Sequence, residues 1–390
     1  EVRDLDIEVT NLSLDKAIGI VMSAKVDDWP FGLEGSFGPV GLTPGQGTLP
    51  LDITVKVFDQ LKARVSGRLE NPAQDLSFDL ALKVDPFSPR QLFEALGLAF
   101  PLTASDPKAL SEASLDVKAS GNKTEASLKD GLLTIDGAKL TFSGRVRDFS
   151  RPDLILAAQL DKIDLDRYMP ADSGKTGASE AKGAGSKKPG ASGPSVLNTL
   201  RLDFSFKAGE MKLKGFKITD IEVAAKGHSG VFEIKPIQAR LGQAGLNAHG
   251  RVDVARNPAD PTFELVFQTA TFSLRELFAS LKLPFPLTAA DQKTFTRFSM
   301  GARVDGGTKA LSVRDGAIAL DDSKLNFTVK VNDVAAQDVS FDVRLDRIDA
   351  DRYLPPADAG EEKTTEAASP KTGNKYDSLR KLALDGKFSA

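Results

Sequence analysis

A direct internal duplication limits what this chain can fold into. Residues 87–170 align without a gap with residues 272–355, at an offset of 185 (272 − 87), and 34 of the 84 aligned positions are identical. Both copies open with Phe-Ser-x-Arg-x-Leu-Phe and close with Leu-Asp-x-Ile-Asp-x-Asp-Arg-Tyr-x-Pro. A long internal period of this kind indicates an array assembled from one supersecondary unit.

Most of each copy alternates between apolar and polar residues, which predicts half-buried β-strands, about 20 in all. The duplication keeps the phase, since Leu115, Val117 and Ala119 become Met300, Ala302 and Val304. A slip of one residue would turn the apolar side chains to water, so the preserved phase is a physical constraint. Three short turn-like sequences predict antiparallel hairpins: Lys129-Asp130-Gly131, Arg314-Asp315-Gly316 and residues 226–230.

The in-phase apolar positions form the candidate binding face. They are Leu76, Phe78, Leu80, Leu82, Leu115, Val117, Leu140, Phe142, Leu202, Phe204, Phe206, Phe263, Leu265, Phe267, Met300, Leu325, Phe327, Phe341 and Val343. The chain has 23 Phe against 3 Tyr and 1 Trp. Because Phe suits wholly apolar surroundings, this face requires a dry partner, either a protein core or a hydrocarbon ligand.

The sequence of each copy also predicts one short helix. Ser88 is placed to cap it in the first copy, followed by Pro89 at the first helical position. In the second copy Ser273 and Glu276 have the spacing of a capping box. Such a helix either lies across an opening or the end of a sheet, or packs on the sheet in the ordinary way.

The domain organisation follows from the copies and from two segments of low complexity. We expect the end of a preceding unit over 1–48, a first repeat over 49–170, a disordered linker over 171–194 and a second repeat over 195–356. A second disordered linker over 357–374 and the start of a third repeat over 375–390 follow. The chain begins at Glu1 and ends within an alternating run, so we interpret it as a part of a longer protein.

The composition argues against several classes of function. Net charge is −3 with acids and bases interspersed, so no basic stripe indicates nucleic-acid binding. There is no Cys, and the two histidines, His228 and His249, lack partners at metal spacing. Ser173-Gly174-Lys175-Thr176 lacks the earlier Gly of a phosphate-binding loop. We therefore expect no enzyme, no cofactor and no metal.

The repeated Asp-x-Ile-Asp-x-Asp-Arg-Tyr has two interpretations. Its carboxylates could be imagined as a Ca²⁺ site, but no Gly-bearing loop accompanies them. The interpretation we favour is a strand that ends in one helical turn. There the Asp side chains cap free N–H groups while Arg and Tyr lie over the sheet edge.

The sequence resembles the AsmA-like family, which includes TamB-type proteins. The resemblance rests on residues 197–252, with Lys-Leu-Lys-Gly followed by Gly230, Val231, Ile234 and Pro236, and on the stops at 167–170 and 352–355. It implies a long, twisted, taco-like antiparallel β-groove in the periplasm, part of a bridge between the inner and outer membranes. The partner would be a phospholipid or other acyl-chain lipid, with membranes at the ends and an inner-membrane anchor outside this sequence.

We therefore expect a mainly β, lipid-conducting groove. The alternative is a closed β-sandwich or solenoid scaffold that binds proteins through its sheet edges, without lipid. The two differ in whether the apolar face is open or filled. The sequence does not indicate which protein partners, if any, would bind.

Overall fold

Alternating residues become extended strands over most of the chain. The structure, a computed structural model, describes residues 2–26, 29–41, 43, 45–58, 60–98, 105–170, 196–257, 260–287, 289, 291–354 and 383–389. These residues form twenty strands, three short α-helices and two 3-10 turns. They divide into two compact units, Glu1–Gly215 and Phe216–Ala390.

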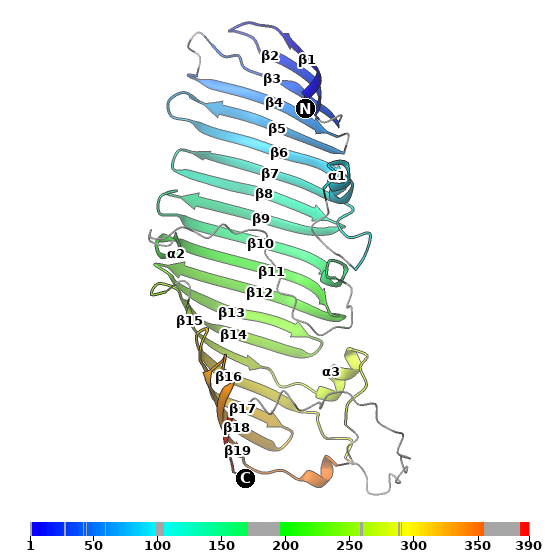
Figure 1. The fold of residues 1–390 in the computed structure, drawn as a ribbon, viewed down its shortest axis with the longest axis vertical. Coiled ribbons are helices and arrows are strands. Elements are labelled where there is room, and N and C mark those ends of the chain that lie inside the picture. Colours follow the sequence, from blue (N-terminus) through cyan, green and yellow to red (C-terminus); the bar gives the residue numbers. More distant parts are fainter. Residues whose placement is uncertain are drawn as a thin grey trace. The chain divides into compact units, whose positions relative to one another are not determined.

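In the first unit every strand pairs with the strand that follows it in sequence (Figure 1). No pairing joins its first strand to its last among the described residues, so this layer is open. The strands are β1 (Val2–Thr10), β2 (Ile18–Val26), β3 (Trp29–Phe37), β4 (Thr48–Val57), β5 (Leu61–Glu70), β6 (Ser77–Phe87), β7 (Ala113–Asn122), β8 (Glu125–Ile135), β9 (Ala138–Arg147), β10 (Asp153–Asp164) and β11 (Arg201–Leu213). The helical elements are α1 (Pro89–Ala95), η1 (Leu165–Arg167) and α2 (Val196–Thr199).

The second unit repeats this arrangement, again with each strand beside its successor. Its strands are β12 (Phe216–His228), β13 (Val231–Leu241), β14 (Ala244–Asp253), β15 (Thr262–Thr269), β16 (Phe298–Gly306), β17 (Leu311–Leu320), β18 (Ser323–Asp333), β19 (Asp338–Leu345) and β20 (Ala383–Ser389). Its helical elements are α3 (Leu274–Ser280) and η2 (Ala350–Arg352). The predicted fold class is confirmed: the chain is mainly β, an open sheet of tandem repeats, with α1 and α3 as the predicted short helices of the copies 87–170 and 272–355.

The sheet is not wholly antiparallel, however. The pairs β10–β11 and β19–β20 run parallel, with Asp153 opposite Arg201 and Asp338 opposite Ala383. The chain therefore leaves β10 at one end of the strands and enters β11 at the other end. We call these two pairs the parallel seams. The low-complexity segments predicted to be disordered, with Ser173–Thr176 among them, lie outside the described residues.

Two of the three predicted hairpin turns are wrong. Asp130 and Asp315 lie in the middle of β8 and β17, each with a left-handed φ, of 51° and 52°. The register shifts there, between Leu128 and Gly131 in β8 and between Val313 and Gly316 in β17. These are β-bulges, since one strand carries an extra residue without reversing. The third turn is correct, because Ser229 and Gly230 join β12 to β13.

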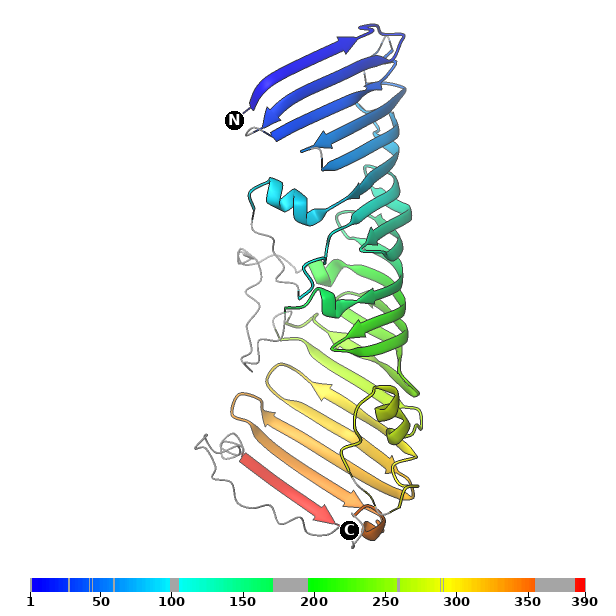
Figure 2. The ribbon, with the colours of Figure 1, turned by 90° about the vertical axis from the view of Figure 1, so that its right-hand side faces the viewer.

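The predicted helices are present, and their serines cap them. Ser88 Oγ accepts from the N–H of Gln91 at 3.3 Å, and Ser273 Oγ accepts from the N–H of Glu276 at 3.2 Å. In Figure 1, α1 lies at the strand ends opposite to those that carry α2. Figure 2 shows α1 projecting from one face of its sheet rather than lying flat on it. We call the strand ends of a unit that carry α1 and η1, or α3 and η2, its helix edge.

Candidate functional site

The pairing register places the predicted apolar residues of each unit on one face of its sheet. Residues directly opposite each other on paired strands point to the same face. In the first unit Leu82 faces Val117, Leu115 faces Leu133, and Leu133 faces Leu140. The series continues from Phe142 through Ala158 to Phe206. Of the predicted set in this unit, Leu76 alone lies outside a strand, one residue before β6.

The second unit gathers its predicted residues in the same way. Phe267 faces Ala302, and Met300 faces Ile318, which in turn faces Leu325. Phe327 faces Val343 across the next pair. We call these surfaces, one in each unit, the apolar faces.

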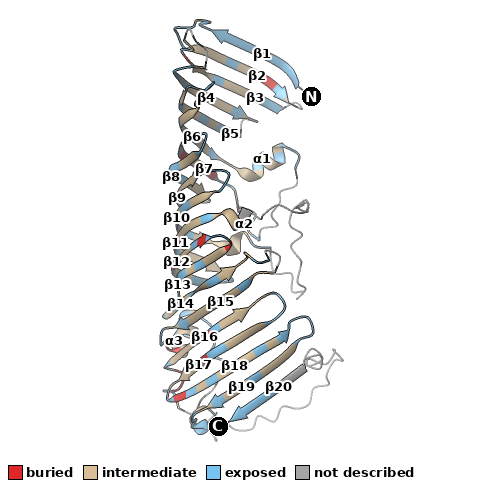
Figure 3. Cartoon of the chain, turned by 90° about the vertical axis from the view of Figure 1, so that its left-hand side faces the viewer, coloured by how far each residue is buried: buried red, intermediate tan, exposed pale blue. Residues whose placement is uncertain are grey.

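The apolar faces are only partly covered. Of the 19 predicted residues, Val117 is buried, Phe341 is 36% exposed, and the others lie between these classes. Figure 3 shows the strands as intermediate or exposed over most of their length, with few buried positions. Within each unit the extensive backbone contacts join neighbouring strands, and β11 with η1. Among the described residues of either unit, no second sheet stacks on the apolar face.

The opposite faces are polar and solvated. They carry cross-strand ion pairs, such as Lys118 with Asp130 at 2.9 Å and Arg145 with Glu125 at 2.6 Å. The hydrogen bond from Lys118 lowers the pKa of Asp130, and the same bond raises the pKa of Lys118. Because these side chains are largely exposed, such pairs add little stability, but they keep this face wet.

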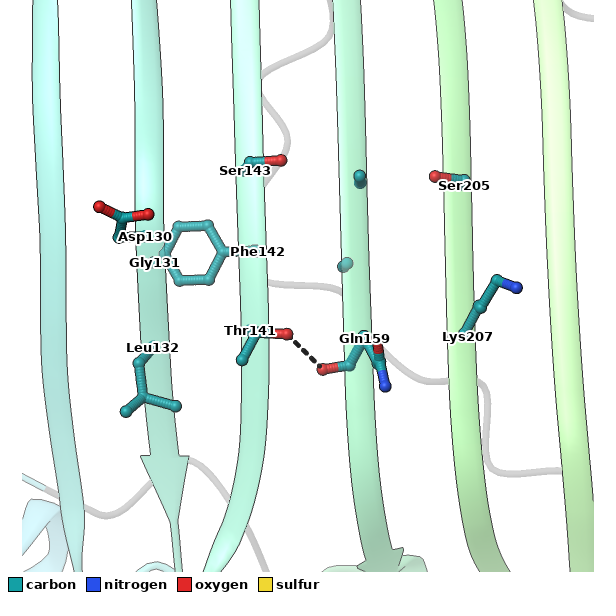
Figure 4. Close-up of a pocket in the computed structure, with 11 residues that line it drawn as sticks. Asp130, Gly131, Leu132, Thr141, Phe142, Ser143, Gln159, Ser205 and Lys207 are labelled. Carbon is teal, nitrogen blue, oxygen red and sulfur yellow. Dashed lines mark hydrogen bonds between the residues drawn. The ribbon is translucent and has the colours of Figure 1, made fainter.

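A shallow depression of about 520 Å³ is formed by β8 to β11, and Figure 4 shows the residues that line it. Thr141, Gln159 and Lys207 line it from the polar face, and the Thr141 hydroxyl lies 3.4 Å from the carbonyl oxygen of Gln159. Of the predicted residues only Phe142 contributes to this depression. The candidate site is therefore the extended apolar face and not this hollow.

The repeated Asp-x-Ile-Asp-x-Asp-Arg-Tyr sequence ends its strand in one turn, and its side chains bind the neighbouring connections. Asp164 caps η1 by accepting from the N–H of Asp166 at 3.1 Å. Asp166 in turn accepts from the N–H of Gly215 at 2.8 Å, in the turn that follows β11. The favoured interpretation is therefore correct for the first copy, whereas Asp349, which precedes η2, makes no such cap.

Arg and Tyr of this sequence complete a network that recurs at the offset of 185. Arg167 pairs with Asp106 at 2.7 Å, and the Tyr168 hydroxyl donates to Asp136 at 2.9 Å. The second copy repeats both distances within 0.2 Å: Arg352 lies 2.9 Å from Asp291, and Tyr353 lies 3.0 Å from Asp321. We call each set of four residues an edge clasp; the sets are Asp106, Asp136, Arg167 and Tyr168, and Asp291, Asp321, Arg352 and Tyr353.

The central carboxylate of each edge clasp holds the helical connection to the sheet. Asp136 accepts from the backbone N–H groups of Leu110, Ser111 and Glu112 at 2.6, 2.9 and 3.1 Å. Asp321 does the same for residues 295–297. Beneath the second connection Phe295 is buried between Phe285 and Tyr353, and Thr294 is fully buried. The tightest packing therefore lies at the helix edge, while the apolar faces stay partly open.

The edge clasps predict a loss of stability in acid. Burial alone would raise the pKa of Asp136, but the hydrogen bonds from Leu110 and Tyr168, with those from Glu112 and Ser111, lower it overall. A lowered pKa in the folded state stabilises the fold above the pKa of the unfolded chain, about 3.9. That stabilisation is lost as pH falls through the folded value. We expect chemical denaturation at pH 5 and pH 3 to show a smaller drop for Asp136→Asn/Asp321→Asn than for the unchanged chain; equal drops would contradict the assignment.

The described residues offer little else that could carry chemistry. Among them, no three His, Cys, Asp or Glu side chains gather in a way that could hold a metal ion. His228 ends β12, and His249 lies within β14. No helix in the described part of the chain is long and apolar enough to cross a membrane.

Each unit is a single-layer, open β-sheet with an apolar face that no second sheet covers among its described residues, and this architecture defines the structural class. Comparison with known families is consistent with this class. Residues 56–296, which are 241 of the 390 (296 − 56 + 1), match the AsmA family, and the chain belongs to that family. This membership associates it with the bacterial envelope and fits the bridge-like lipid transport proteins. No curated protein and no solved structure matches the chain.

Proposed function

We propose that this chain is a segment of a periplasmic groove that binds and conducts phospholipids between the inner and outer membranes. The observation that carries the proposal is the apolar face that runs in phase through each unit without a covering sheet among the described residues. Membership of the AsmA family supports it. An inner-membrane anchor would lie outside this sequence.

The proposed mechanism needs no covalent chemistry. Each acyl CH₂ group removed from water contributes about 0.8 kcal/mol, so aliphatic and aromatic side chains alone supply the affinity. Phe142 and Leu82 contact the acyl chains of the lipid on the apolar face, while the lipid headgroups remain in water on the side that no sheet covers. Because one strand offers nearly the same surface as the next, a lipid exchanges similar contacts as it moves.

A protein scaffold without lipid is the competing function. A closed sandwich would need two sheets stacked face to face, whereas each unit forms a single layer in its described part. Binding of a protein through a sheet edge is compatible with the structure, since all nine residues of β1 are exposed. That function makes no use of the predicted apolar residues, most of them partly exposed, on eight other strands, which favours the lipid-binding function.

Photocrosslinking from the two faces tests the proposal. A photoreactive amino acid replaces Phe142 or Phe327 on the apolar face, or their neighbours Thr141 or Thr328 on the polar face. We expect phospholipid to co-purify with the chain and to crosslink from the two Phe positions at least tenfold more than from the two Thr positions. Equal crosslinking from both faces, with no co-purifying lipid, would exclude the lipid-binding function.

A further inference from the structure

Several phenylalanine rings on the apolar faces lie directly over a glycine of the neighbouring strand. A β-carbon built on Gly131 would lie 2.6 Å from the ring of Phe142, and Figure 4 shows that ring extending from β9 toward Gly131 in β8. The second copy repeats the contact, with 2.6 Å between a β-carbon on Gly316 and the ring of Phe327. The other pairs of this kind are Gly227–Phe232 and Gly386–Phe341.

The backbone does not require glycine at these places. Glycine is needed where φ is positive or where another group approaches the backbone closely. None of these four glycines has a positive φ, and in each the Phe ring is the group nearest to the position of a β-carbon, so the ring is what requires glycine there. Gly32 and Gly245, on the polar faces, differ from these glycines, because a β-carbon on either would meet its nearest neighbour at an ordinary 3.7 or 3.8 Å.

The pairing of glycine with phenylalanine makes the surface of the apolar face flatter. Each of these Phe residues is opposite its glycine in the register, as Phe142 is opposite Gly131, so both belong to one face. A ring that lies along the backbone presents its flat side, whereas an upright ring leaves a step beside a gap.

We propose that these glycine–phenylalanine pairs set the rate at which lipids move along the apolar face. The inference rests on the proposed lipid-binding function. An acyl chain gains extra contacts wherever a step and a gap fit its width, and it must lose them again to move on. Rings that lie flat over glycine remove these places of stronger binding, which would otherwise slow the movement of the lipid. The pairs therefore control lipid mobility, whereas the total apolar area controls how much lipid binds.

The test compares lipid loading with lipid exit. The chain carrying Gly131→Ala/Gly316→Ala is saturated with a pyrene-labelled phosphatidylglycerol, and its release into excess phosphatidylcholine vesicles is followed by stopped flow. A β-carbon lifts both rings, and a gain of about one CH₂ of contact slows exit about fourfold. The amount loaded at saturation stays within about twofold, because little apolar area changes.

Matched controls separate mobility from folding. Gly32→Ala/Gly245→Ala, on the polar faces, leaves the exit rate unchanged. Adding Phe142→Leu and Phe327→Leu to the first variant shortens the displaced side chains and restores fast exit. If the unchanged chain loads no phospholipid, the proposed function fails. If it loads normally and exit is equally fast in the Gly131→Ala/Gly316→Ala and control variants, the mobility inference fails while the binding function stands.

Discussion

Introducing two carboxylates on the apolar face of β9 is expected to reduce phospholipid binding around that strand at least tenfold. The change is Leu140→Asp/Phe142→Asp, at two positions whose side chains share one face of the sheet. An acyl chain in contact with them would strip water from two charges, which costs several kcal/mol, and each 1.4 kcal/mol is a factor of ten. The measurement is lipid crosslinking from a photoreactive residue at Phe204, on the apolar face two strands away.

The same strand supplies the control. Thr141→Asp/Ser143→Asp adds the same charge between and beside the same positions, but on the polar face, and we expect normal crosslinking at Phe204. Leu325→Asp/Phe327→Asp and Asn326→Asp/Thr328→Asp repeat the comparison in the second unit. Unchanged crosslinking in a folded Leu140→Asp/Phe142→Asp chain would mean that the acyl chains do not run over this face.

The apolar faces were predictable because the residues that determine them lie close together in sequence and occur in both copies. Period-two alternation fixes which side chains share a face of one strand. The offset of 185 then shows that the phase matters, since Leu140 and Phe142 return as Leu325 and Phe327. The same reasoning located both capping serines. These features depend on neighbours two to four residues apart, which a sequence displays directly.

The bulges were misread because their sequence is that of a turn. Asp-Gly between apolar runs favours a left-handed φ at Asp, and the structure has that conformation at Asp130 and Asp315. A hairpin and a bulge use the same local geometry, so only the pairing register distinguishes them. The parallel seams were missed for a similar reason, because parallel pairing of β10 and β11 is decided by where the chain re-enters the sheet.

The edge clasps and the glycine–phenylalanine pairs depend on partners far apart in sequence. Asp136 and Tyr168 are 32 residues apart, and Arg167 and Asp106 are 61 apart. The duplication did carry a signal, since each of these residues recurs at 185 and so do Gly131 and Phe142. Recurrence shows that a residue matters, but its partner becomes known only from the register.

Removing the central carboxylate of one edge clasp opens that connection and leaves its counterpart closed. Asp136→Ala deprives three backbone N–H groups and the hydroxyls of Ser111 and Tyr168 of their acceptor, at a cost of about 3 kcal/mol. Hydrogen exchange then loses protection at Leu110, Ser111 and Glu112, while residues 295–297 keep theirs. Asp321→Ala gives the opposite pattern, so each copy is the internal control for the other.

The same experiment distinguishes a local clasp from a general loss of stability. Tyr168→Phe removes one of the five donors to Asp136 and costs about 1 kcal/mol, with a correspondingly smaller rise in exchange at Leu110. Asp116→Ala, at an exposed position on β7, leaves both connections protected. A uniform loss of protection in both copies would contradict the assignment. A loss confined to the first copy would mean that each repeat secures its own helix edge, so that repeats can be added without weakening those already present.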